Sequence, residues 1–106
     1  MRAGELKHLV IFCEKVTTKG KYLESKEELV EKYWMKCKLI QYKAADEVKN
    51  LENFNEQFLI FEAYRRPITT SMIARYEGNE YDVVSVDPSP YDLTMKISLK
   101  RIKSNG

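Results

Sequence analysis

The sequence is poor in the residues from which most metal and cofactor sites are built. Its 106 residues include one histidine, two cysteines and four glycines. His8, Cys13 and Cys37 do not have the spacing of a recognised zinc site. The glycines form no loop that would cradle a phosphate. We therefore expect neither a metal nor another cofactor.

Signatures of a catalytic nucleophile are also lacking. Ser85 and Ser89 are not surrounded by the Gly-x-Ser-x-Gly elbow of serine hydrolases. Asp82, Asp87 and Asp92 are spread over the end of a predicted strand and the loop after it, where solvated acids are commoner than an acid–base pair. The sequence thus predicts a protein that is not an enzyme.

An excess of one charge is missing as well. The 18 Lys and Arg residues against 16 Asp and Glu give a formal net charge of +2, which makes no electrostatic case for a nucleic-acid or membrane partner. The apolar run that ends at Cys13 is too short for a signal-peptide core, and no segment approaches the ~20 apolar residues of a membrane span. Cys13 and Cys37 form no Cys-x-x-Cys pair, which favours buried free thiols in a reducing cytoplasm over a disulfide or a reactive thiol.

What the sequence does contain is a regular alternation of apolar and polar residues. This alternation and the chain length predict one domain over residues 1–102, with 103–106 as a frayed polar tail. The predicted strands are Leu6–Glu14, Tyr33–Tyr42, Phe58–Tyr64, Ser71–Glu77, Glu80–Asp87 and residues 93–102. They predict a mainly β fold, a small antiparallel six-stranded β-barrel or sandwich with one or two short helices in long loops.

The same alternation predicts the core. The expected inward side chains are Met35, Cys37 and Leu39 in one strand and Leu93, Met95, Ile97 and Leu99 in the last, where Thr94, Lys96, Ser98 and Lys100 should point outward. Phe58–Tyr64 differs, because both of its faces are apolar except at Glu62. Its second face must then be covered by a helix or by another subunit.

Three connections carry their own signals. The sequence from Glu77 to Glu80 predicts a tight hairpin turn in which Gly78 supplies a positive-φ position. Ser25 and Glu28 have the spacing of a capping box, which predicts a helix over residues 25–33, whereas a long hairpin around Gly20 fits the same residues. In Lys43–Glu56 apolar residues recur at three and four, which predicts a short helix.

A basic row near the C-terminus allows a second class of function. Lys96, Lys100, Arg101 and Lys103 follow one another here, and the chain also has seven tyrosines and Trp34. A barrel that binds single-stranded nucleic acid would place such cations and aromatics on one exposed sheet face. Because these lysines alternate with core residues, a solvated outer face is the plainer interpretation.

The order of these features resembles that of a known family. The N-terminal stretch "MRAGELKHLVIF" has a glycine, a leucine and a basic pair before the first strand. Trp34 opens the next core strand, and "KAADEV" follows as a small-residue and acidic helix start. The stretch "YRRPITTSMIARYEGNEYDVVSV" matches the pattern Arg-x-x-Ile-Thr followed by Tyr-x-Gly-x-x-Tyr-x-Val-x-x-Val. From Met1 to about Ile102 the chain resembles the phage head-tail joining proteins, the head-closure or head-tail adaptor family of tailed bacteriophages and prophages.

The resemblance implies a structural virion protein that is made in the bacterial host cytoplasm. Copies would form a ring, typically dodecameric, at the portal or adaptor vertex, although the isolated chain can be monomeric. The ring would close the DNA exit channel and offer a docking surface for the tail. The implied partners are portal and adaptor connector proteins, tail-completion or tail-tube proteins, and packaged double-stranded DNA. A related tail-completion protein and the single-strand binding module are the alternatives.

Candidate contact residues follow from this implied assembly. The second apolar face of the Phe58 strand and the predicted helix beside it would meet a neighbouring subunit, through Phe58, Ile60, Tyr64, Leu51 and Phe54. DNA in the lumen would be met by charge alone, through Lys96, Lys100 and Arg101. The long segments Thr17–Lys32 and Lys43–Glu56 are expected to make most contacts with other proteins.

Overall fold

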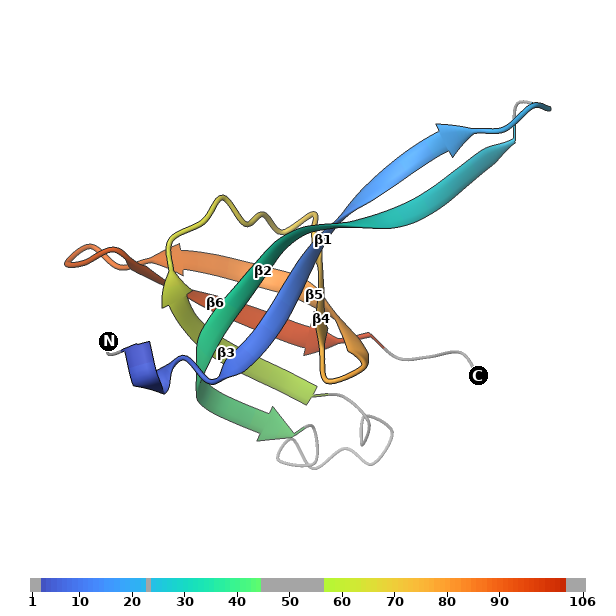
Figure 1. Ribbon diagram of the computed structural model, residues 1–106. Coiled ribbons are helices and arrows are strands. Elements are labelled where there is room, and N and C mark those ends of the chain that lie inside the picture. Colours follow the sequence, from blue (N-terminus) through green and yellow to red (C-terminus); the bar gives the residue numbers. More distant parts are fainter. Residues whose placement is uncertain (1–2, 23, 45–56, 103–106) are drawn as a thin grey trace.

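The computed structural model describes residues 3–22, 24–44 and 57–102. A short 3-10 turn, η1, precedes six strands. The elements are η1 (Ala3–Glu5), β1 (His8–Lys19), β2 (Ser25–Ala44), β3 (Gln57–Tyr64), β4 (Ile73–Tyr76), β5 (Asn79–Pro88) and β6 (Thr94–Arg101). All pairings are antiparallel, and β1 pairs with both β2 and β4, so the sheet closes in the order β1-β2-β3-β6-β5-β4 (Figure 1). The predicted mainly β, six-stranded antiparallel barrel is confirmed.

The core occupies the inside of the closed sheet, as the period of two predicted. Leu59, Phe61 and Ala63 of β3 lie beside Leu99, Ile97 and Met95 of β6, and all six side chains are buried. Met35 and Cys37 of β2 are also buried, and Leu39 packs against the cluster. Rings fill the space between the strands, for the centroids of Phe61 and Tyr76 lie 5.1 Å apart in an edge-to-face contact.

The start of β6 departs from the prediction. Leu93 was expected inside and Thr94 outside, yet Leu93 is 73% exposed and Thr94 is buried. The reason is that the strand begins only at Thr94, whose backbone N–H donates to a carboxylate oxygen of Asp92 at 3.0 Å. The strand therefore starts one residue later than predicted, and the predicted alternation holds from Met95 onward, with Ile97 and Leu99 also buried.

The largest difference from the prediction is the length of β1 and β2. Apart from one bulge, the two strands stay paired from His8 opposite Cys37 to Lys19 opposite Ser25, and the N–H of Gly20 donates to the carbonyl of Glu24 at 2.8 Å across the turn. The helix predicted over residues 25–33 is wrong, and the alternative hairpin around Gly20 is confirmed. The strand predicted over Leu6–Glu14 is likewise only the inner part of β1.

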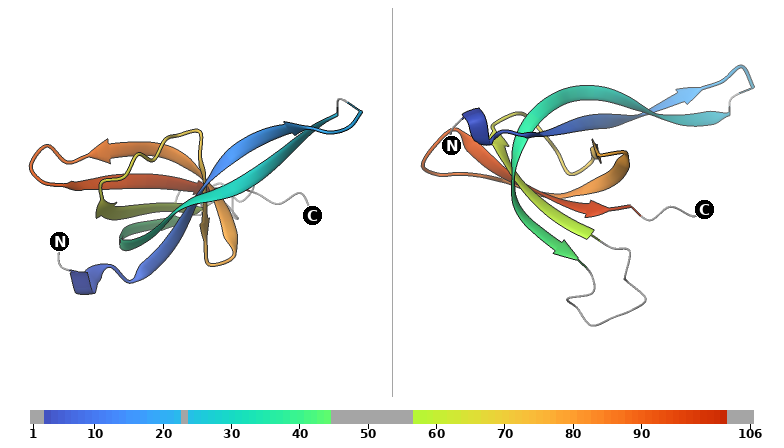
Figure 2. Two further views of the ribbon diagram at one scale, coloured as in Figure 1. Left: turned by 45° about the horizontal axis from the view of Figure 1, so that its top comes forward. Right: turned by 60° about the horizontal axis from the view of Figure 1, so that its bottom comes forward.

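The outer part of this hairpin leaves the barrel as an arm, which we define as residues 14–32. A β-bulge between Phe12 and Cys13 marks its root, and a bulge bends and twists a strand. Beyond Cys13, which still pairs with Ile73 of β4, the two strands pair only with each other and extend away from the other four (Figures 1 and 2). The molecule accordingly measures 50 × 36 × 22 Å, with a radius of gyration of 15.6 Å against about 13 Å for a compact domain of this size.

The remaining connections agree with the sequence to different degrees. Glu77 and Gly78 form the two-residue turn between β4 and β5, with φ values of 49° and 78°. The helix predicted over Lys43–Glu56 begins too early, because Lys43 and Ala44 still pair with β3. Its remainder lies outside the described residues.

Candidate assembly surfaces

The arm exposes both of its faces. Thr17, Thr18 and Lys19 of β1 and residues 25–28 of β2 are exposed, and Tyr22 at the tip is 85% exposed. Two ion pairs lie on its surface. Lys32 of β2 and Glu14 of β1 are 2.7 Å apart and join the two strands, and Lys26 and Glu28 are 3.6 Å apart within β2. Exposed pairs of this kind contribute about 0–1 kcal/mol each, so the arm has little internal support beyond its backbone ladder.

The root of the arm is fixed to the barrel more firmly. Arg75 of β4 lies 3.6 Å from Glu31 and 3.4 Å from Glu80, so one guanidinium joins the arm to the β4–β5 hairpin. Cys13 is fully buried at this point, between Glu31 and Ile73 in the sheet. Burial raises the pKa of the Cys13 thiol, and the nearby Arg75 opposes that shift.

The loop between β5 and β6 is built differently from the arm. It follows Pro88, the last residue of β5, and we call the segment from Pro88 to Leu93 the knob. The backbone N–H of Arg65 donates to the carbonyl of Leu93 at 2.9 Å, and the N–H of Ser89 donates to the carbonyl of Thr94 at 2.9 Å. Arg65 also donates through its guanidinium to the carbonyl of Ser89. The knob is thus tied to the end of the barrel by hydrogen bonds at several points.

Side chains within the knob add to this order. The hydroxyl of Ser89 accepts from the N–H of Tyr91 at 3.1 Å. Both the N–H and the hydroxyl of Thr94 donate to Asp92, and these hydrogen bonds lower the pKa of the Asp92 carboxyl. In spite of this ordering, Tyr91 is 94% exposed. The knob therefore presents apolar side chains from a fixed backbone.

A second exposed apolar surface lies on the outside of β1 and β2. Ile11 pairs with Trp34, and Leu9 pairs with Lys36 two residues further along the same face. Trp34 is 64% exposed, Leu9 is 45% exposed and Ile11 is half-buried. We call Leu9, Ile11 and Trp34 the β1–β2 patch. The run from Leu9 to Phe12 is apolar on both faces, which predicts a strand covered from both sides, but the sequence did not indicate that Leu9 and Trp34 would be exposed together.

The residues proposed from the sequence as a subunit interface lie only partly within the described chain. Leu51 and Phe54 are outside the described residues. On the outer face of β3, Phe58 and Ile60 are half-buried and Tyr64 is exposed. The ammonium of Lys100 lies 5.7 Å from the centroid of the Phe58 ring, so part of this face is already covered. An interface role for these residues stays a prediction.

The three cations proposed to meet DNA share β6 with acidic neighbours. Lys96 lies between Glu62 of β3 and Asp87 of β5 in the sheet, and Lys100 lies opposite Asp82. Arg101 donates through its guanidinium to the side-chain oxygen of Asn79 at 3.0 Å. The outer face of β6 therefore carries mixed charge, and DNA contact by these cations stays a prediction.

The described residues offer no ready site for a metal ion. No group of three or more His, Cys, Asp or Glu side chains there is arranged to hold a metal ion. His8 is occupied in another way, because its Nδ1 lies 2.7 Å from the hydroxyl of Tyr76. Cys13 and Cys37 are free and buried, as predicted, and burial raises the pKa of Cys37 to about 12. The described part of the chain has no helix that is long and apolar enough to cross a membrane.

The fold is shared with several solved structures, including two with low sequence identity. One is a solution structure of a protein from Shigella flexneri 2a, with 14% sequence identity, a TM-score of 0.62, and 100% of both chains covered. The other comes from the virion of a native gene transfer agent particle, with 7% identity and a TM-score of 0.61, over 91% of this chain and 94% of that one. At these identities the likeness shows the fold. No curated protein matches the sequence.

The fold alone does not identify the family of this chain, but a match to a family model does. The model described as phage head completion protein matches residues 1–97, which is nearly the whole chain and agrees with the resemblance drawn from the sequence. The match includes β1 and β2 with the arm, the β4–β5 hairpin and the knob. The chain belongs to the phage head completion protein family and has a structural role in completing the phage head.

Proposed function

We propose that copies of this protein assemble as a ring at the portal or adaptor vertex of the head, where the ring closes the DNA exit channel and provides the docking surface for the tail. The function needs binding surfaces and no catalytic group. It is carried above all by one observation, the arm, which beyond its root at the Arg75–Glu31 ion pair extends from the barrel as a ribbon of two strands.

The physical argument starts from the stability of a two-stranded ribbon. An isolated pair of strands is marginally stable in water at best, and stable pairs are packed against another strand, a helix or a partner. From Lys15 to Lys19 the arm has no third strand beside it among the described residues. A chain that keeps such an element is expected to pack it against another protein, since that contact would order it fully.

The composition of the arm favours protein over DNA as that partner. Its residues 14–32 contain five lysines and five glutamates, so its net charge is zero. Binding to the DNA backbone depends on an excess of positive charge that displaces counterions. Mixed charges with Val16, Leu29 and Val30 between them are the pattern of a protein contact in which both surfaces carry both signs.

An arm-shortened variant tests this proposal. Lys15 and Leu29 are paired directly, so replacing residues 16–28 by Asn-Gly gives a two-residue hairpin without moving the barrel. The wild-type chain should join purified connector complexes of the same phage as a ring, seen by native mass spectrometry and electron microscopy. The shortened variant should fold, by circular dichroism, and fail to join.

A matched control distinguishes loss of the arm from a change of one charge on its surface. Lys21 lies at the exposed tip and makes no ion pair among the described residues, so Lys21→Ser keeps the arm intact and should leave incorporation unchanged. Equal incorporation of the shortened variant would contradict the role given to the arm. If the wild-type chain bound only a tail-side component, the alternative of a tail-completion protein would replace head closure.

A further inference from the structure

We propose that the knob of one copy docks onto the β1–β2 patch of the next copy, so that Tyr91 and Leu93 pack against Leu9 and Trp34 of the neighbour. The inference rests on the proposed ring and deepens it, because it names the contact between adjacent subunits. It needs a second copy of this chain and no other partner.

The first step is that the knob is ordered before it binds. Pro88 and Pro90 fix two φ angles, and hydrogen bonds from Arg65 and within the loop hold its backbone. Tyr91 and Leu93 nevertheless stay 94% and 73% exposed. A fixed loop that presents a tyrosine and a leucine loses little conformational entropy on binding, which is the property of a preformed docking element.

The second step is that the patch offers a matching surface. Trp34, Leu9 and Ile11 form one strip on the outer face of two paired strands, so their relative positions are set by the sheet. The inner face of the same strands already supplies the core through Val10, Phe12 and Met35. Folding alone therefore does not account for apolar residues on the outer face.

Two exposed acids flank the apolar residues of the knob and two exposed lysines flank those of the patch, while Lys96 lies opposite Asp87 and Arg75 lies opposite Ile11 in the sheet. Asp87 and Asp92 flank Tyr91 and Leu93 at the knob, and both are exposed. Lys7 and Lys36 flank the patch, both are exposed, and neither lies within 4.0 Å of a carboxylate of the described residues. Opposite charges at the rim of an apolar contact favour this pairing over a contact of two knobs or two patches, which would bring like charges together.

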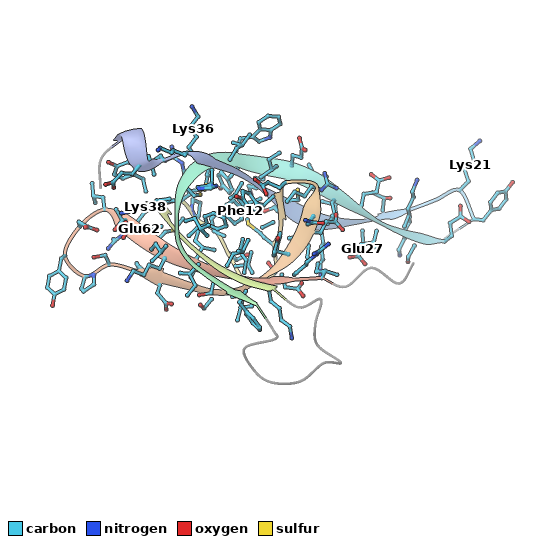
Figure 3. The ribbon with its side chains drawn as sticks, turned by 90° about the horizontal axis from the view of Figure 1, so that it is seen from below. Phe12, Lys21, Glu27, Lys36, Lys38 and Glu62 are labelled. Atoms are coloured by element: carbon cyan, nitrogen blue, oxygen red, sulfur yellow. The ribbon has the colours of Figure 1, made fainter. Side chains whose placement is uncertain are left out.

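The position of the surfaces suits a closed ring. In the strand order of the closed sheet, the β1–β2 pair is opposite the β6–β5 pair that carries the knob. Lys36 marks the β1–β2 side in Figure 3, where its side chain points away from the barrel. Each copy can thus contact one neighbour through its knob and another through its patch, which is the head-to-tail arrangement that generates rings.

Engineered cross-linking tests the contact directly. The two native thiols are buried, so cysteines introduced by Lys36→Cys and Tyr91→Cys are the accessible ones. A chain that carries both substitutions should give a ladder of covalent multimers with a short bis-maleimide linker, at high concentration and on the connector. Each single variant should give at most background. Lys36→Cys combined with Val84→Cys is the control, because Val84 is exposed on β5 outside the knob.

Mixing two defective variants tests whether the contact is between unlike surfaces. Tyr91→Asp disrupts the knob and keeps the patch, whereas Trp34→Asp disrupts the patch and keeps the knob. Each variant alone should be monomeric in sedimentation velocity. A mixture of the two should form dimers, because the intact knob of one variant can bind the intact patch of the other. Cross-linking of the Tyr91→Cys variant with itself, or no product above the Val84 control, would overturn the inference. If rings still form on the connector in that case, the proposed function stands and only this contact is wrong.

Discussion

At the residue scale, the β4–β5 turn needs a glycine because of a backbone conformation that side chains disfavour, and not because a side chain would clash there. Gly78 has φ 78°, and a Cβ built on it would meet no atom within 4 Å. Gly78→Ala should therefore lower the free energy of unfolding by about 1–2 kcal/mol, the cost of a left-handed conformation for a residue with a side chain.

Chemical denaturation measures this change, and Gly4→Ala is its matched control. Gly4 also has open space around its Cβ position, but its φ is not in the left-handed region. The control should stay within about 0.5 kcal/mol of the wild type. Equal effects of the two substitutions would mean that strain at Gly78 is not what the turn depends on.

The two cysteines allow a second prediction at this scale. Burial raises the pKa of Cys37 to about 12 and also raises that of Cys13, so neither forms a thiolate readily in the folded protein. A chromogenic disulfide reagent at pH 8 should find no reactive thiol in the native chain and two in denaturant. Rapid reaction of a native thiol would show that one of these sites opens easily.

The same shift fixes how stability depends on pH. An unfolded cysteine loses its proton near pH 8.5, whereas folded Cys37 keeps it to about pH 12. The folded state thus binds more protons in this range, and its stability is full below pH 8.5 and falls as the pH rises toward 12. Denaturation curves between pH 8 and 10 should show this fall, and Cys37→Ala should reduce its slope.

Single residues also show what the sequence could predict. The inward phase of Phe61 and Ile97 follows from alternation, because a period of two assigns every side chain of a strand to one face. Leu93 and Thr94 were assigned wrongly because alternation does not say where a strand starts. That start is set here by hydrogen bonds from Thr94 to Asp92, which no pattern of apolar residues records.

At the element scale, the arm shows how a long-range pairing overrides a local signal. Ser25 and Glu28 have capping-box spacing, yet both lie in β2 opposite Lys19 and Val16. A cap contributes about 1 kcal/mol, whereas pairing satisfies the backbone of every residue along the ribbon. The choice depends on the β-branched stretch Val16–Thr18 in the other strand, which a window around Ser25 does not contain.

Hydrogen exchange should divide β1 into two parts. Amides at Val10 and Phe12 lie within the closed sheet, and those at Val16 and Thr18 lie in the two-stranded arm. We expect strong protection in the first part and at least about tenfold faster exchange in the second, because the arm can open without unfolding the barrel. Protection of the arm should rise when the chain joins its connector. Uniform protection along β1 in the isolated chain would mean that the arm needs no partner.

At the scale of the whole molecule, the sequence predicted the family and the barrel but neither of the two surfaces through which we propose that copies join. The resemblance to the family rested on the order of strands and turns along this chain. Trp34 entered the resemblance only as the start of a core strand, and neither it nor Tyr91 indicated a contact surface, because a tyrosine in a Pro-rich loop and a tryptophan in a strand are each unremarkable in one dimension. Only the closed sheet shows that they are exposed and lie on opposite sides of the molecule.

The proposed subunit contact combines an apolar centre with a charged rim, and the two parts should respond differently to salt. Trp34→Ala removes an apolar anchor and should weaken self-association by at least about tenfold, without changing its dependence on ionic strength. Lys36→Gln removes a rim charge and should weaken association mainly at low salt, since screening already reduces that attraction at about 0.5 M. Sedimentation velocity of both variants over a salt series measures the two effects. The same salt dependence in both variants would mean that the charges near the patch do not face the knob, and the contact would then need another partner surface.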